Sequence, residues 1–153
     1  MQSKALYLLL ALALLGAMAI FAWTNPSYEK AFEAKWYYLT GDYDTALELA
    51  KEAYSEDPYN RMALTTLNRA KIAKIYADYI HEGENYFQTI EAIARHKPID
   101  EADRIRIKMM CEVMLGRYAA LPDTPLVDPA LKKEAHTIYR KFKELYDSLF
   151  KAK

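Results

Sequence analysis

The sequence has little of several residue types that define particular kinds of protein. Cys111 is the only cysteine among 153 residues, so neither an internal disulfide nor a cysteine-based zinc cluster can form. Only two valines are present and no run alternates apolar with polar residues, so we expect no β-strand. The four glycines form no phosphate-binding loop. These shortages indicate an all-α protein.

Neither sign of charge is in excess. The chain carries 21 Lys and Arg against 21 Asp and Glu, whereas a nucleic-acid-binding protein needs a basic face that displaces counterions from the phosphates. Basic runs occur at 95–97 and 104–108, but acidic residues close by in the sequence offset both. We therefore expect no nucleic-acid partner.

Groups that could carry catalysis or hold a metal ion are scarce. His81, His96 and His136 are not spaced to converge on one helix face, so no metal site is expected. Cys111 lies among methionines, a setting typical of a buried structural thiol. No nucleophile motif of the Gly-x-Ser-x-Gly type is present. The sequence thus predicts a protein that is not an enzyme, with no cofactor, no metal and no small-molecule substrate.

One long apolar run stands out against this background. Residues 5–23 contain no charge over 19 positions, and as a helix they would extend about 28 Å, close to the ~30 Å hydrocarbon core of a bilayer. Lys4 precedes the run, and Trp23 would lie at the membrane interface. We therefore predict that residues 1–24 are a signal anchor that crosses the lipid bilayer through residues 5–23.

The orientation and the retention of this segment are separate questions. Lys4 and the amino terminus favour a cytoplasmic N-terminus. This orientation predicts a single-pass protein of a bacterial inner membrane, with residues 25–153 on the extracytoplasmic side. Ala17-Met18-Ala19 is a small-x-small sequence at which a signal peptidase could cut. A secreted protein that begins near Ile20 is therefore the alternative.

Capping signals predict a helical hairpin directly after the apolar run. Asn25-Pro26 is typical of a helix start, with Asn as the N-cap and Pro in the first turn. A helix over 26–39 should end at Gly41, and a second helix over 43–56 should end before Pro58. Two helices joined by so short a turn are expected to pack antiparallel.

The 34 residues of the segment 27–60 resemble one tetratricopeptide repeat, a helix-turn-helix unit of the same length. The resemblance rests on a turn glycine, aromatic residues in and before the second helix, small residues where helices approach closely, and a closing proline. These positions are Gly41, Tyr37, Tyr43, Ala46, Ala53 and Pro58. The resemblance implies a solenoid of such hairpins that binds another protein on its inner surface.

Further units are expected because a lone hairpin cannot bury its apolar face. We predict a degenerate repeat over 61–98 that turns at Gly83, and a partial repeat over 100–121 that turns at Gly116. Asp128-Pro129 should begin a last helix over 128–151, whose single apolar stripe caps the solenoid.

The resemblance also implies which side chains face a ligand. In the first helix of each hairpin, the matching positions that we predict to bind a partner are Tyr28, Lys35, Tyr38, Thr65 and Arg69. The consecutive aromatics Trp36, Tyr37 and Tyr38 span about 200° of a helix, so they cannot all be buried. One of them is expected to face solvent or a partner, and the alternative is that Tyr37 is core while the other two lie along the helix edges.

These observations predict a membrane-anchored, non-catalytic protein–protein interaction module. It would act as a scaffold, assembly factor or accessory subunit for protein partners at or in the membrane. One alternative is a structural subunit held in a larger complex through its transmembrane helix. A secreted binder, released by signal cleavage, is the other.

Overall fold

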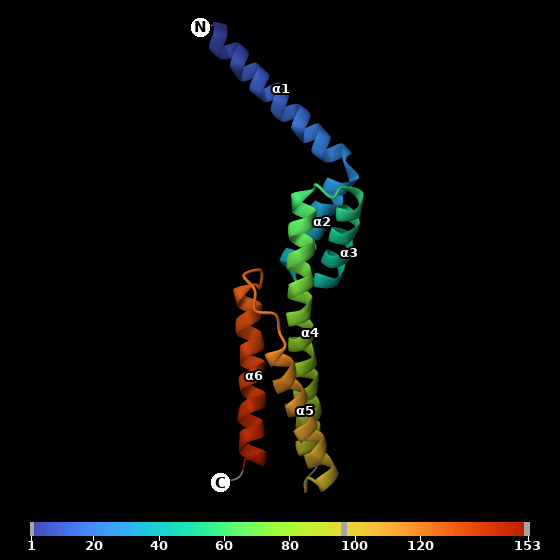
Figure 1. The fold of residues 1–153 in the computed structure, drawn as a ribbon, viewed down its shortest axis with the longest axis vertical. Coiled ribbons are helices and arrows are strands. Elements are labelled where there is room, and N and C mark those ends of the chain that lie inside the picture. Colours follow the sequence, from blue (N-terminus) through green and yellow to red (C-terminus); the bar gives the residue numbers. More distant parts are fainter. Residues whose placement is uncertain (1, 96–97, 152–153) are drawn as a thin grey trace. The chain divides into compact units, whose positions relative to one another are not determined.

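The computed structural model describes residues 2–95 and 98–151, and every regular element in these ranges is an α-helix (Figure 1). The chain divides into two compact units, Met1–Lys71 and Ile72–Lys153. The prediction of an all-α fold is confirmed over the described residues.

Helix α1 (Gln2–Thr24) contains the apolar run, and here the membrane prediction fails. Among the described residues, no helix is both long enough and apolar enough to cross a bilayer. This finding contradicts both the transmembrane helix over 5–23 and the single-pass inner-membrane location. The side chains of Lys4 and Trp23, which supported that prediction, lie outside the described part.

Helices α2 (Pro26–Thr40) and α3 (Tyr43–Glu56) form the predicted hairpin, and their capping residues set its ends. The Asn25 side chain accepts a hydrogen bond from the Ser27 amide at 3.0 Å. Gly41 ends α2 in the left-handed region with φ 89°, which a glycine adopts without strain. Asp42 then caps α3 by accepting from the amide of Thr45 at 3.1 Å. The predicted limits of both helices are confirmed to within a residue or so.

Alanine side chains form the interior of this hairpin. They allow the helix backbones to approach closely, which is why larger residues are missing there. The alanines without solvent exposure come from α2, α3 and the first turns of α4 (Arg61–Arg95): Ala31, Ala34, Ala46, Ala50, Ala53, Ala63 and Ala70. Tyr54 and Met62 pack at the edge of this cluster.

The Asn60 side chain joins α2 to the start of α4 through four hydrogen bonds, and Ser27 extends this network to α3. Its Oδ1 caps α4 by accepting from the amides of Met62 and Ala63, both at 3.1 Å. Its Nδ2 donates to Oγ and to the backbone oxygen of Ser27 at 2.9 and 3.2 Å. The Ser27 hydroxyl in turn donates to the Ala53 carbonyl at 2.9 Å. Asn60 is completely buried, so this network fixes where α4 begins against the hairpin.

The chain departs from the predicted solenoid after residue 60. Helix α4 runs through Gly83 without a turn, and α5 (Glu101–Ala119) runs through Gly116. The predicted hairpins over 61–98 and 100–121 are therefore wrong. A helical glycine costs only about 1 kcal/mol relative to alanine, which does not end a helix whose neighbouring residues are packed.

Gly83 has a packing role in the second unit. A Cβ placed on it would lie 2.5 Å from Cγ2 of Ile138 and 3.1 Å from Cε of Met114. The absent side chain thus makes room for α6 (Pro129–Phe150) and α5 against α4. The glycine marks a close approach between helices within this unit.

Helix α6 lies where the last helix was predicted, and its N-cap is Asp128, which accepts from the Ala130 amide at 2.8 Å. Its apolar stripe packs on α5 and on the second half of α4. Phe142, completely buried, stacks on Phe87 with ring centroids 4.1 Å apart. The buried stripe comprises Leu131, Ala135, Ile138 and Phe142. The final helix therefore completes the core of the second unit.

Candidate functional site

A groove in the first unit brings together most of the residues predicted to face a ligand. It lies between α2 and the first turns of α4 and forms an open cavity of about 400 Å³. Arg61, Thr65 and Arg69 are spaced four residues apart, so they share one face of α4. The lining residues are Lys35, Tyr38, Leu39, Arg61, Met62, Thr65, Thr66 and Arg69.

Four of the five predicted binding residues line this groove, namely Lys35, Tyr38, Thr65 and Arg69. Tyr28 is not among the lining residues and is half-buried. Tyr28 lies on the same side of α2 as Lys35, but two helical turns closer to the N-terminus, which places it beyond the end of the cavity.

Three cations in the groove form no ion pair with the described part of the chain. Lys35, Arg61 and Arg69 are exposed, and none of them forms an ion pair with any described residue. Lys30, on the opposite side of α2, contrasts with them because its ammonium group lies 2.6 Å from Glu56 and 2.9 Å from Glu52. These hydrogen bonds, to Glu56 and then Glu52, raise the pKa of Lys30 above its ordinary value. The positive charge of the groove is therefore open to a ligand.

Large apolar side chains extend along α2 beside the groove. Phe32, Trp36 and Leu39 are 67%, 62% and 69% exposed, and their spacing of four and three residues places them on one helix face. Sequence reasoning missed Phe32, although this spacing was readable in the sequence. The apolar ridge, as we call these three residues, adjoins the groove at Leu39.

The three consecutive aromatics of α2 have different environments. Trp36 is the most exposed, while Tyr37 is 36% exposed and thus not the core residue of the alternative interpretation. Tyr38 is half-buried and meets the ring of Tyr43 edge-on, with centroids 5.7 Å apart. The expectation that one aromatic faces outward is met by Trp36.

Other reactive groups are not assembled into a site in the part of the chain described. No three His, Cys, Asp or Glu side chains there are close enough to hold a metal ion. Cys111 is completely buried, and this burial, with the nearby Glu112 carboxylate, raises the pKa of its thiol to about 11. His136 shares a 3.1 Å hydrogen bond with the Tyr118 hydroxyl. His96 lies outside the described residues.

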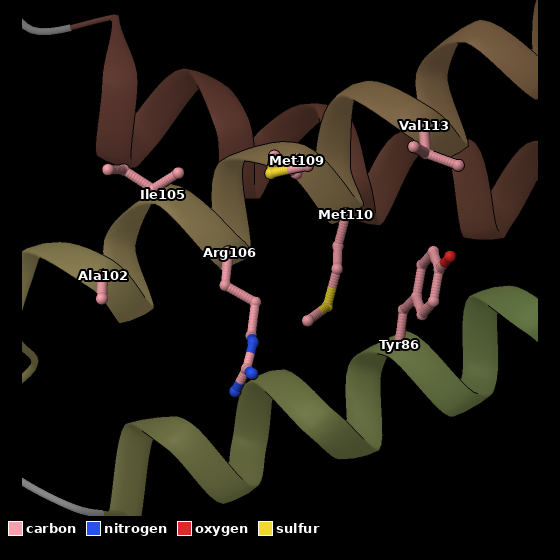
Figure 2. Close-up of a pocket in the computed structure, with 7 residues that line it drawn as sticks. All are labelled: Tyr86, Ala102, Ile105, Arg106, Met109, Met110 and Val113. Carbon is pink, nitrogen blue, oxygen red and sulfur yellow. The ribbon is translucent and has the colours of Figure 1, made fainter.

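A second hollow, of about 440 Å³, lies in the second unit between α4 and α5 (Figure 2). Its lining is mainly apolar, with one cation. The residues are Tyr86, Ala102, Ile105, Arg106, Met109, Met110 and Val113. Sequence reasoning identified no site here.

Comparison with known proteins yields no relative. No family model matches the chain, and neither a curated protein nor a solved structure does. The resemblance to a tetratricopeptide repeat therefore rests on the residues of segment 27–60, and the function has to be argued from the groove itself.

Proposed function

We propose that this chain is a non-catalytic protein-binding module, whose groove between α2 and α4 binds a carboxylate-bearing segment of another protein. The observation that supports this most is a set of three cations that pair with no described acidic residue, placed around a cavity with a partly apolar lining. Cationic groups beside an apolar surface are suited to a peptide, which offers both carboxylates and apolar side chains.

The cations would give the groove its preference for acidic partners. Arg61 and Arg69 can each bind a carboxylate through two parallel N–H groups, and Lys35 adds a point charge from α2. Arg61 and Arg69 are eight residues apart on one helix, about 12 Å along its axis. Because all three are exposed, each pair would contribute modestly to affinity and more to the rate and salt dependence of binding.

Apolar contacts would supply most of the affinity. Tyr38, Leu39 and Met62 provide the aromatic and aliphatic surface of the groove, and aromatic and methionine side chains are enriched where proteins bind one another. Trp36 extends this surface onto the apolar ridge. The proposed partner is thus an acidic segment that also carries apolar side chains.

Site-specific photo-crosslinking in cells tests the proposal. A photoreactive amino acid at Thr65, inside the groove, should crosslink a defined protein that mass spectrometry identifies. The same photoreactive amino acid introduced in place of Glu48, which is exposed on α3, is the matched control and should not capture that protein.

Charge reversal then tests the chemistry of the groove. Lys35→Glu and Arg69→Glu should each lower the Thr65 crosslink yield by roughly threefold to tenfold, as expected for opposing an exposed charge. Equal capture from Thr65 and Glu48, or yields unaffected by both reversals, would refute the groove as the binding site.

A further inference from the structure

Helix α5 is apolar on two opposite sides. Ile107, Cys111 and Met114 are buried against the rest of the second unit. Ile105, Met109 and Val113 lie on the other side and are 52%, 60% and 43% exposed. At ~100° per residue these two sets are nearly opposite each other. We call the exposed set the α5 stripe, and a helix with two apolar sides is typically packed between neighbours.

The stripe borders the hollow of about 440 Å³ in the second unit. Figure 2 shows Tyr86 extending from α4 toward Met110, while Arg106 extends from α5 toward α4. Ile105 and Met109 point away from α4, so the helix beside them leaves the stripe uncovered. A contact surface thus exists on α5 that the described residues do not fill.

We propose that the α5 stripe binds the same stripe of a second copy of this chain, with the two α5 helices antiparallel about a two-fold axis at Met109. In this register, Met109 meets the partner's Met109, and Ile105 meets Val113 of the partner subunit. The small residue Ala102 lies opposite Gly116 of the partner subunit, so both ends of the paired helices can approach closely. The sequence around Met109 is therefore self-complementary in size.

Charge complementarity favours a second copy as the occupant. Lys108 and Glu112 lie along one edge of the stripe, 46% and 50% exposed, and their own ion pair is long at 3.9 Å. Antiparallel pairing about Met109 places Glu112 within two residues, about 3 Å along the axis, of the partner's Lys108. Two ion pairs thus form by symmetry. Arg106 and the partner's Arg106 are six residues apart, about 9 Å, where salt largely screens their repulsion.

The size of the surface sets the expected strength. Helix α5 has 19 residues, about 28 Å, and pairing along one such helix buries less than the ~1,200–2,000 Å² of a standard stable interface. The dimer should therefore be weak and concentration-dependent. An apolar helix of another protein is the competing occupant, and in that case the purified chain would not dimerise through α5.

Cysteine crosslinking of the full chain tests the register. Under mild oxidation, Met109→Cys should give a disulfide-linked dimer, because both thiols lie at the two-fold axis. Ile105→Cys alone should not, since its copy would lie eight residues, about 12 Å, away. A mixture of Ile105→Cys with Val113→Cys should crosslink again. The unsubstituted chain, whose Cys111 is buried, is the background.

Tyr59→Cys, at a 92% exposed position, measures crosslinking by random collision or by association elsewhere. Met109→Cys should react on the order of 100-fold faster, because thiols within a dimer meet at mM effective concentration. Equal rates for these two variants, or crosslinking of Ile105→Cys alone, would overturn the proposal.

The charge pairing has its own test in the Met109→Cys background. Glu112→Lys should slow crosslinking by roughly threefold to tenfold, and adding Lys108→Glu should restore it. A double reversal that remains as slow as the single one would refute the proposed register.

Discussion

Replacement of Asn60 by alanine should destabilise the first unit far more than its size suggests. The side chain is completely buried and makes four hydrogen bonds, two as the cap of α4 and two to Ser27. Loss of an N-cap costs about 1 kcal/mol. The two lost hydrogen bonds to Ser27, at ~0.5–1.5 kcal/mol each, add a further ~1–3 kcal/mol.

These contributions give an expected loss of about 2–4 kcal/mol in the free energy of unfolding. For a chain of this length that corresponds to a fall in Tm of roughly 4–16 °C. Urea and thermal unfolding of the full chain, followed by circular dichroism at 222 nm, would measure both quantities.

Asn68→Ala is the matched control, because Asn68 is an exposed asparagine on the same helix and in the same unit. It should be neutral or stabilise slightly, by up to ~0.7 kcal/mol, through the higher helix propensity of alanine. Asn60→Asp keeps the capping oxygen but loses both donations to Ser27, so it should recover only part of the stability or none of it.

Ser27→Ala completes a double-mutant cycle. Its own cost should be about 1 kcal/mol, because the Ala53 carbonyl still accepts from the Asp57 amide at 3.1 Å. The double variant with Asn60→Ala should be more stable than the sum of the single losses predicts. If Asn60→Ala and Asn68→Ala unfold alike, or if the cycle is additive, Asn60 does not join the helices as described.

Three further predictions concern the second unit. In urea unfolding, Gly83→Ala should lower the free energy of unfolding, because its Cβ would lie 2.5 Å from an α6 isoleucine. Gly116→Ala, whose Cβ would have nothing within 4 Å, should raise the free energy of unfolding by up to ~1 kcal/mol. Tyr79→Phe should be neutral or stabilising in thermal unfolding, since its buried hydroxyl has no partner among the described residues; Tyr76→Phe removes a 3.1 Å hydrogen bond to a backbone carbonyl and should cost about 1 kcal/mol. Burial raises the pKa of Cys111 from 9.0 to about 11, so the unfolded chain loses this proton first and the free energy of unfolding should fall between pH 9 and pH 11. Urea titrations at pH 9 and pH 11 should show a smaller fall in the free energy of unfolding for Cys111→Ser than for the unsubstituted chain. An equal fall in both proteins would contradict this prediction.

Local signals predicted the helix ends well, because a cap acts within a few residues of the chain. Asn25, Gly41 and Asp128 occupy the predicted capping positions. Gly83 was misread because glycine in a helix and glycine in a turn look alike in a sequence. What distinguishes them here is Ile138, 55 residues further on, which packs where a side chain would be.

The groove was predictable only in part. Lys35, Tyr38, Thr65 and Arg69 follow from the resemblance of segment 27–60 to a known repeat and from the helix after it. Arg61 was missed because its position relative to α2 depends on the buried Asn60 network, which no periodicity reveals. The apolar run gave a correct helix but a wrong membrane span, since no helix among the described residues is both long enough and apolar enough to cross a bilayer.

The alanine interior of the first unit has a consequence for how that unit responds to solvent and temperature. An alanine side chain buries little apolar surface area. Unfolding a hairpin packed on alanines therefore exposes less apolar area than unfolding a leucine-packed hairpin of the same length. Its m-value in urea and its heat-capacity change should accordingly be small, with a broad and shallow stability curve. The stability of such a hairpin depends more on the conformations of its turns and helix caps than on the apolar area that it buries. Its sensitivity to mutation should therefore be concentrated at caps such as Asn60 and Gly41.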